Sequence, residues 1–239
     1  MLKENERLDD LQCNGFRVIQ DPDGYCFTSD SVILANLASV KRTDRVVDLC
    51  SGSGVVALLL QAKHSPKEIV CVELQPRLAD MAKRSVAFNN VQNTVKVVNA
   101  PLQGVRETIG DGYDVVIVNP PYETCEKKEN PTEEEICRSE QKVTCEEVVS
   151  ESARLLKFGG LFYMVNKSRR LADVMFYMKK YGVEPKKLYL IQPKKEKDVD
   201  AFVVEGKKGA KPYLVTPKPL VVYDENGDYT DEVRRLYNK

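Results

Sequence analysis

From residue 45 onward, the chain alternates between short apolar runs and longer stretches with helical periodicity. Short runs rich in β-branched residues are typical of buried parallel strands, and the stretches between them are long enough for crossover helices. The expected strands cover residues 45–50, 69–72, 95–98, 114–118 and 161–165, and the expected helices cover residues 55–62, 77–88, 146–156 and 170–181. The alternation predicts an α/β fold whose central, mostly parallel sheet carries helices on both faces.

Two further apolar runs follow the last of these helices, at residues 187–192 and 200–205. The short charged segment 194–198 between them favours an antiparallel hairpin at the end of the sheet, which then has seven strands. Segment 206–218 is rich in Pro, Gly and Lys and is typical of a surface connection. We therefore expect one domain, with a core at 45–206, a leading segment at 1–44 and a tail at 207–239.

A strand, a glycine-rich turn and a helix follow one another at residues 46–57. The turn contains Ser51, Gly52 and Gly54 in a Gly-x-Gly-x-x-Ala pattern. Glycine has no Cβ, so such a turn brings backbone N–H groups against a ligand at the carboxyl edge of the sheet. Glu73 ends the next strand about twenty residues later, where a carboxylate reaches the ribose of a nucleoside. The pattern predicts an adenosine-containing cofactor; a plain tight turn with an exposed strand-end charge is the alternative.

Asp48 helps to distinguish two kinds of cofactor that this turn could serve. The features so far also fit a nicotinamide-dependent dehydrogenase. However, a carboxylate just before the turn would repel a pyrophosphate and attract the ammonium and sulfonium charges of S-adenosylmethionine. Asp48 therefore favours S-adenosylmethionine.

The fourth expected strand runs directly into Asn119-Pro120-Pro121-Tyr122. Consecutive prolines make this turn rigid and remove two N–H donors. An exocyclic amine of a nucleobase is a poor nucleophile because its lone pair is delocalised into the ring, and acceptors for its two protons favour a tetrahedral nitrogen. The amide oxygen of Asn119 and the carbonyl of Pro120 can be those acceptors, and the base can stack on Tyr122. The motif predicts methyl transfer to an exocyclic amino nitrogen without a metal; a simple strand-terminating turn is the alternative.

These motifs resemble the cofactor and catalytic motifs of class I amino methyltransferases, which have a Rossmann-like core. Residues 24–35 are similar to the segment that precedes the first strand in this group and lies against the methionine part of S-adenosylmethionine. With Gly160-Leu161 and tail residues 219–224 included, nearly the whole chain resembles the bacterial tRNA (adenine-N6)-methyltransferases. Those enzymes modify the adenosine just 3′ of the anticodon in a valine tRNA, position 37. The resemblance implies the same reaction, with tRNA as the partner.

Residues and resemblance together define a candidate site. The expected catalytic residues are Asn119, Pro120 and Tyr122. The expected cofactor-binding residues are Phe27, Thr28, Asp30, Asp48, Ser51, Gly52, Gly54, Glu73, Leu74, Asn99, Ala100 and Asn119. Asn99 stands where many class I enzymes present an acid to the adenine of the cofactor, so it would offer neutral hydrogen bonds instead. Taken alone, residues 27–30 are typical of a helix N-cap.

Two segments depart from the pattern of these relatives. Arg138-Ser139-Glu140 stands where they tend to carry Arg-His-Glu, and residues 166–170 differ from their usual His-Arg-Pro type. Both segments lie where a substrate could be contacted, which leaves the tRNA and the modified position open. Segment 123–140 is a long charged loop after the fourth strand; it is either functional or a solvated excursion.

Composition limits how RNA could be bound. Lys plus Arg and Asp plus Glu both total 36, so the net charge is zero and RNA binding must rest on a local patch. The candidate basic pairs are Lys41-Arg42, Arg169-Arg170, Lys179-Lys180, Lys186-Lys187, Lys194-Lys195 and Lys207-Lys208. Several such charges must share one face to neutralise phosphates, and ordinary solvated surface is the alternative.

The seven cysteines never form Cys-x-x-Cys, which argues against a disulfide framework or a zinc site. The chain has no apolar run of about eighteen residues, and its N-terminus is charged where a signal peptide is apolar. We therefore expect a soluble cytoplasmic protein with neither a membrane nor a metal partner.

Other functions fit parts of the pattern. The same chemistry could act on guanine N2 in ribosomal RNA or on the glutamine amide of a translation release factor. Enzymes of the latter kind carry a separate N-terminal helical domain, for which the roughly forty residues before Arg45 leave little room. A non-catalytic RNA- or nucleotide-binding module is disfavoured by the intact motifs, and a dehydrogenase would bind NAD rather than S-adenosylmethionine.

Overall fold

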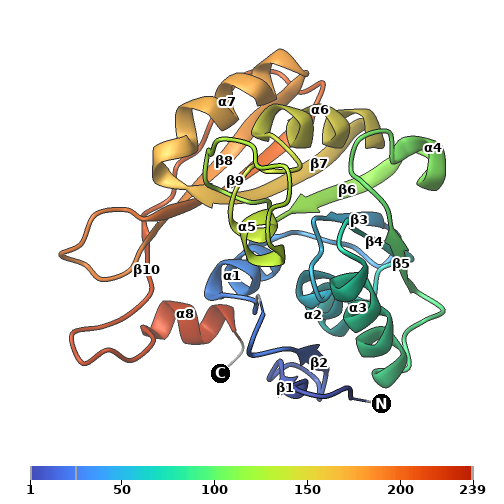
Figure 1. Ribbon diagram of the computed structural model, residues 1–239. Coiled ribbons are helices and arrows are strands. Elements are labelled where there is room, and N and C mark those ends of the chain that lie inside the picture. The colour runs from blue at the N-terminus through green and yellow to red at the C-terminus, as the bar shows by residue number, and fades with distance from the viewer. Residues whose placement is uncertain (1, 25, 238–239) are drawn as a thin grey trace.

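The computed structural model describes residues 2–24 and 26–237. Its centre is an eight-stranded sheet in the order β10-β8-β9-β7-β6-β3-β4-β5 (Figure 1). Within this described sheet, β9 alone runs antiparallel to its neighbours. The strands are β3 (Arg45–Leu49), β4 (Glu68–Glu73), β5 (Val95–Asn99), β6 (Tyr113–Val118), β7 (Leu156–Lys167), β8 (Val183–Gln192), β9 (Ala201–Lys208) and β10 (Leu220–Val221).

Helices cover both faces of the sheet (Figure 1). One layer consists of α1 (Ser29–Leu37), α2 (Val55–His64) and α3 (Pro76–Phe88), and the other of α4 (Arg106–Ile109), α6 (Cys145–Leu155) and α7 (Leu171–Lys180). Successive strand side chains point to opposite faces. In β6, for example, Val115 and Ile117 join the core under α1 and α2, whereas Val116 and Val118 join the core under α6 and α7. Burial of both faces explains the continuous apolar runs in the sequence.

The structure confirms the α/β architecture and the strands and helices expected from periodicity, with ends displaced by a few residues. The expected count of seven strands is wrong, because β10 pairs in parallel with β8. The β8–β9 hairpin is antiparallel as expected, but β10 lies beyond it at the edge of the sheet. A strand of two residues that follows Pro219 shows no alternation of its own, so periodicity could not reveal it.

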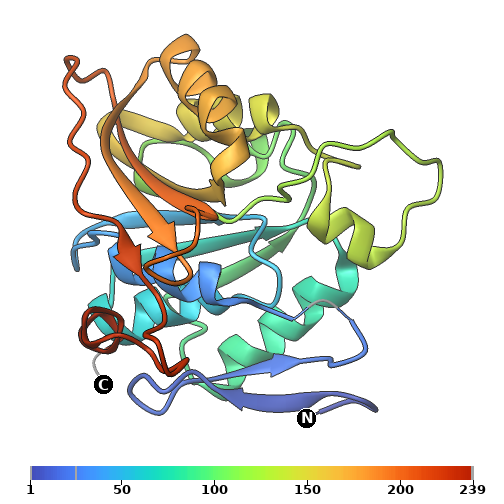
Figure 2. The ribbon, with the colours of Figure 1, turned by 90° about the vertical axis from the view of Figure 1, so that its left-hand side faces the viewer.

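The leading segment and the tail both pack beside the helices α1 to α3. Strands β1 (Arg7–Asp10) and β2 (Arg17–Gln20) form a separate hairpin next to α3 (Figure 2), where the Ile19 amide donates to the Ser85 hydroxyl at 2.9 Å. In the tail, helix α8 (Asp231–Leu236) is preceded by two stacked rings, those of Tyr223 and Tyr229, whose centroids are 5.4 Å apart.

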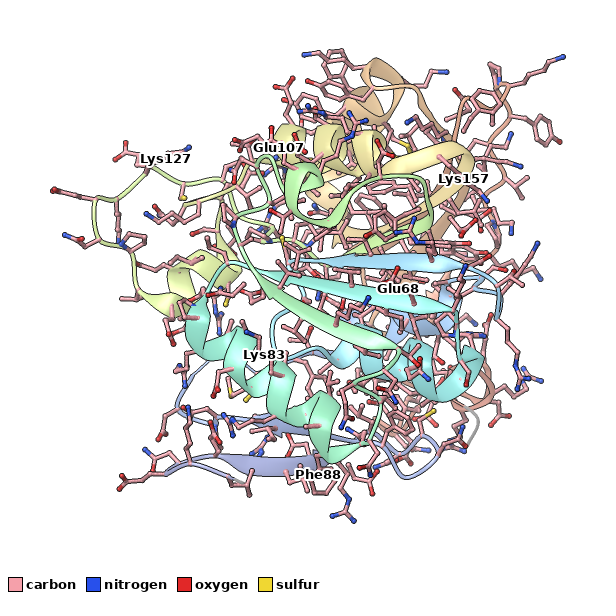
Figure 3. All side chains as sticks on the ribbon, turned by 90° about the vertical axis from the view of Figure 1, so that its right-hand side faces the viewer. Glu68, Lys83, Phe88, Glu107, Lys127 and Lys157 are labelled. Atoms are coloured by element: carbon pink, nitrogen blue, oxygen red, sulfur yellow. The ribbon has the colours of Figure 1, made fainter. Side chains whose placement is uncertain are left out.

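The long segment after β6 was predicted to be a loop but contains a helix, α5 (Glu133–Arg138). Thr132 and Glu135 form a reciprocal capping box that starts α5. The two ends of the segment lie side by side, because the Glu140 amide donates to the Glu123 carbonyl at 2.8 Å. Figure 3 shows Lys127 of this segment at the opposite end of the molecule from Lys157, so the segment overhangs the carboxyl edge of the sheet.

Within residues 2–24 and 26–237, no helix is long and apolar enough to cross a bilayer. The same residues contain no group of three or more His, Cys, Asp or Glu side chains that could hold a metal ion.

Candidate functional site

The carboxyl ends of β3, β4, β5 and β6 open into a pocket, which we call the glycine-turn pocket. Ligands of open α/β sheets bind at this edge. Eight of the residues predicted to bind the cofactor line it: Phe27, Asp48, Ser51, Gly52, Glu73, Leu74, Ala100 and Asn119. Ile136 and Cys137 of α5 also line it, so the segment after β6 forms one of its walls.

The turn between β3 and α2 adopts backbone conformations that L-residues rarely adopt. Gly52 has φ +56° and Gly54 has φ +87°, and the non-glycine residue Cys50 has φ +54°. A Cβ on Gly54 would lie 3.4 Å from the Cβ of Ala82 on α3. Gly52 therefore shapes the pocket wall, whereas Gly54 starts α2 and permits close helix packing without lining the pocket.

Glu73 is only 6% exposed, and backbone amides fix both of its carboxylate oxygens. The Gly52 amide donates to Oε2 at 2.8 Å and the Gln75 amide donates to Oε1 at 2.8 Å. Burial raises the pKa of Glu73, and the amide hydrogen bonds partly offset this rise. Because a carboxylate has about four acceptor positions, each oxygen can still accept a hydroxyl donor from a ligand.

Asp48 lies deeper in the same pocket and is 1% exposed. Its Oδ2 is buried and has no hydrogen-bond partner among the described residues. Burial raises the pKa of Asp48 to about 8, although the Ala57 backbone amide opposes this rise. A buried carboxyl group without a partner is costly, so the pocket favours a ligand that donates hydrogen bonds or carries positive charge.

Asn99 supports the pocket without lining it. Its exposed side chain donates to the carbonyls of Glu73 at 2.8 Å and Leu74 at 2.9 Å, which fixes the end of β4. Ala100, the next residue, lines the pocket instead. A contact between Asn99 and the adenine of a cofactor stays a prediction.

A second pocket adjoins the first, and Phe27 and Cys137 line both. We call it the Tyr122 pocket. Its polar lining includes Thr28, Asp30, Tyr122, Lys167 and Asp200. Thr28 and Asp30, which were predicted to contact the cofactor, line this pocket and not the glycine-turn pocket. Thr28 is the N-cap of α1, although its side chain makes no capping hydrogen bond.

Asn119 stands between the two pockets, because it lines the first and bonds to Tyr122, which lines the second. Its Nδ2 donates to the Ser31 hydroxyl at 2.8 Å, and its Oδ1 accepts from the Tyr122 hydroxyl at 2.5 Å. The Tyr122 hydroxyl is also 3.2 Å from Oδ2 of Asp30. These bonds fix the Asn119 amide in one orientation before any substrate binds.

Arg170 fixes the backbone at the Asn-Pro-Pro-Tyr turn. Its guanidinium donates to the Tyr122 carbonyl at 3.3 Å and pairs with Glu140 at 2.9 Å. It therefore ties both ends of the segment after β6 to the core. Arg170 was predicted as a possible RNA contact, but the residue is 9% exposed and already paired.

The site residues that were not predicted include Ser31, Gln75 and Lys167. Gln75 is buried in the glycine-turn pocket and its Nε2 lies 3.0 Å from the Cys137 sulfur of α5. Lys167 lies in segment 166–170, which departs from the family pattern. That departure was the feature of the sequence that could have identified Lys167 as a site residue.

Three of the six basic pairs contain residues that form ion pairs with nearby carboxylates, which lowers the net charge they offer to phosphates. Besides Arg170–Glu140, these ion pairs include Lys179–Glu184, Lys180–Glu146 and Lys187–Glu205. Lys194 and Lys195 are exposed on the turn between β8 and β9, next to Pro193 of the Tyr122 pocket.

Comparison with known proteins agrees with this geometry. The family model described as methyltransferase small domain matches residues 28–181. A tRNA1(Val) (adenine(37)-N6)-methyltransferase of Haemophilus influenzae is 23% identical over 237 residues, covering 92% of this chain and 93% of the relative. Its namesake from Bacteroides thetaiotaomicron is 30% identical over 156 residues, 65% of each chain. The structure of a predicted O-methyltransferase from Agrobacterium tumefaciens superposes with a TM-score of 0.72 at 20% identity, covering 87% of this chain and 95% of that one.

Proposed function

The chain belongs to the methyltransferase small domain family, and from that premise we propose that it methylates N6 of an adenosine in tRNA, at position 37 of a valine tRNA. Two relatives that cover this chain to 92% and 65% carry that activity in their names. The observation that carries the proposal is the placement of Asn119 between two pockets, with its amide oriented by Ser31 and Tyr122.

The glycine-turn pocket fits S-adenosylmethionine. The Asp48 carboxyl has an unpartnered buried oxygen that suits the ammonium group of the methionine part. Glu73, which ends β4, suits the ribose hydroxyls, and Ala100 and Leu74 offer an apolar wall to the adenine. The chemistry that the cofactor supplies when bound is a methyl group on a positively charged sulfur.

The Tyr122 pocket would hold the target base. Asn119 Oδ1 and the Pro120 carbonyl would accept the two amino protons, which increases the nucleophilic character of N6 at the junction of the pockets. The Tyr122 hydroxyl now occupies Oδ1, so it must share or leave that oxygen when the amine arrives. The described residues supply acceptors at the reacting nitrogen, and the last proton can pass to water.

Methylation of total tRNA from cells that lack this protein tests the proposal. Purified protein and labelled S-adenosylmethionine are used, and the digested nucleosides are analysed by mass spectrometry. The expected product is N6-methyladenosine that maps next to a valine anticodon. N2-methylguanosine, or label that enters only ribosomal RNA or protein glutamine, would overturn the substrate assignment. Tight NAD binding with weak S-adenosylmethionine binding would overturn the assignment of S-adenosylmethionine as the cofactor.

Replacing Glu73 with alanine should weaken S-adenosylmethionine binding by about 10- to 100-fold, because hydrogen bonds to a charged acceptor are worth about 1.5–3 kcal/mol. Calorimetric titration measures the change. Glu68→Ala is the matched control, since Glu68 begins the same strand, away from the pocket (Figure 3), and should leave affinity unchanged. Equal affinities of the Glu73→Ala variant and the unmodified protein would remove Glu73 from the cofactor site.

A further inference from the structure

Lys167 is a cationic side chain that reaches into the Tyr122 pocket, and the proposed reaction gives it no role so far. It ends β7, and its ammonium pairs with Asp200 at 2.8 Å and with Asp30 at 3.4 Å. The same ammonium lies 5.4 Å from the centroid of the Tyr122 ring. Lys167 therefore lies over the ring on which the target base would stack, within reach of the edge of a base stacked there.

We propose that Lys167 donates a hydrogen bond to ring nitrogen N1 of the target adenine and thereby selects adenine over guanine. This inference rests on the proposed function. On the Watson–Crick edge of adenine, the amino group at C6 is a donor and the adjacent N1 is an acceptor. With its Watson–Crick edge in the same orientation and its N2 amino group at the same place, guanine would present N1–H, a donor that cannot pair with an ammonium.

The geometry leaves Lys167 a donor for this contact. An ammonium has three N–H donors, and Asp30 and Asp200 take two of them. Asp30 also lies 3.2 Å from the Tyr122 hydroxyl, which in turn bonds to Asn119. One short chain of contacts thus links the proposed N1 donor to the proposed N6 acceptor, as reading two neighbouring atoms of one base requires.

Charge and burial favour Lys167 over the other cation in this pocket. The Lys167 side chain is 25% exposed, and its two carboxylate partners raise its pKa in spite of desolvation, so it stays an ammonium. Arg138 also lines the pocket, but its side chain is 64% exposed and pairs with Glu134 within its own helix. A partly buried, oriented donor discriminates more strongly than an exposed one, because an unmatched partner is left without water.

A double-mutant cycle that combines the Lys167→Met substitution with removal of N1 from the substrate tests the proposal. The substrates are two anticodon stem-loops of the valine tRNA, one with adenosine and one with 1-deazaadenosine, which replaces N1 by C–H, at the target position. For the unmodified enzyme we expect kcat/KM to fall by about 10- to 100-fold on the deaza substrate. Lys167→Met should show a similar loss on adenosine and no further loss on 1-deazaadenosine.

The matched control is Lys157→Met, because Lys157 lies at the other end of β7 and also pairs with an aspartate, Asp114 (Figure 3). It should keep the full preference for adenosine. Losses that multiply in the cycle, or equal rates of the unmodified enzyme on both stem-loops, would overturn the role of Lys167 while leaving the methyltransferase assignment intact. No methylation of adenosine in either the stem-loop or whole tRNA would instead overturn the proposed function, and the role of Lys167 with it.

Discussion

Replacing Asn119 with alanine should lower kcat for methyl transfer by about 10³-fold while the Kd for S-adenosylmethionine stays within about threefold of its original value. The variant loses the Oδ1 acceptor that is already oriented by Ser31 and Tyr122. Because this acceptor binds the amine more strongly as the nitrogen becomes tetrahedral, its loss affects the transition state more than the bound cofactor. Single-turnover kinetics and calorimetric titration measure the two quantities separately.

Two further variants sharpen this test. Asn93→Ala makes the same chemical change on an exposed turn and should leave both quantities unchanged. Asn119→Asp keeps an acceptor oxygen but replaces the Nδ2 donor to Ser31 with a second carboxyl oxygen and adds an ionisable group, so its loss of kcat should be smaller than that of Asn119→Ala. Near-normal turnover by Asn119→Ala would show that another group accepts the amino protons.

The sequence could predict those parts of the site whose position follows from the order of strands and turns along the chain. A strand followed by a turn places its last residues at the carboxyl edge of a parallel sheet, so Asp48, Gly52, Glu73 and Asn119 had to meet there. The structure places all four on the glycine-turn pocket. The apolar runs located the core strands for a related reason, since burial on both faces leaves a continuous signal.

The parts that could not be predicted depend on contacts between distant segments. Ser31 meets Asn119 across 88 residues, and Lys167 meets Asp30 across 137 residues. No local pattern marks such partners. Thr28 and Asp30, which the family resemblance placed against the cofactor, line the neighbouring pocket, so their contact with the cofactor stays a prediction. Helix α5 was different, because the capping box of Thr132 and Glu135 was readable in the sequence and was overlooked.

Burial of Asp48 in the glycine-turn pocket lowers the free energy of unfolding as the pH rises. Its pKa, raised by burial to about 8, exceeds the ordinary value of 3.8, so the folded protein keeps this proton at pH values where the unfolded chain has lost it. The contribution of Asp48 to stability is therefore complete below about pH 4 and is lost as the pH rises to about 8. A cationic ligand reverses this preference, because it stabilises the ionised carboxylate.

Replacing Asp48 with asparagine should therefore move folding and binding in opposite directions. Asparagine cannot ionise, so the free energy of unfolding of the variant should rise relative to the original between pH 5 and pH 8.5, with an upper limit of about 6 kcal/mol set by the rise in pKa from 3.8 to about 8. At pH 8.5, affinity for S-adenosylmethionine should fall by about 10- to 100-fold. In the original protein, affinity should increase with pH up to about pH 8 more steeply than in Asp48→Asn. Urea unfolding and titration calorimetry on the same pH series measure both effects, and any fixed cost of the asparagine amide cancels in the pH difference. If affinity for S-adenosylmethionine changed with pH in the same way in the two proteins, Asp48 would not be the carboxylate that meets the cofactor's positive charge.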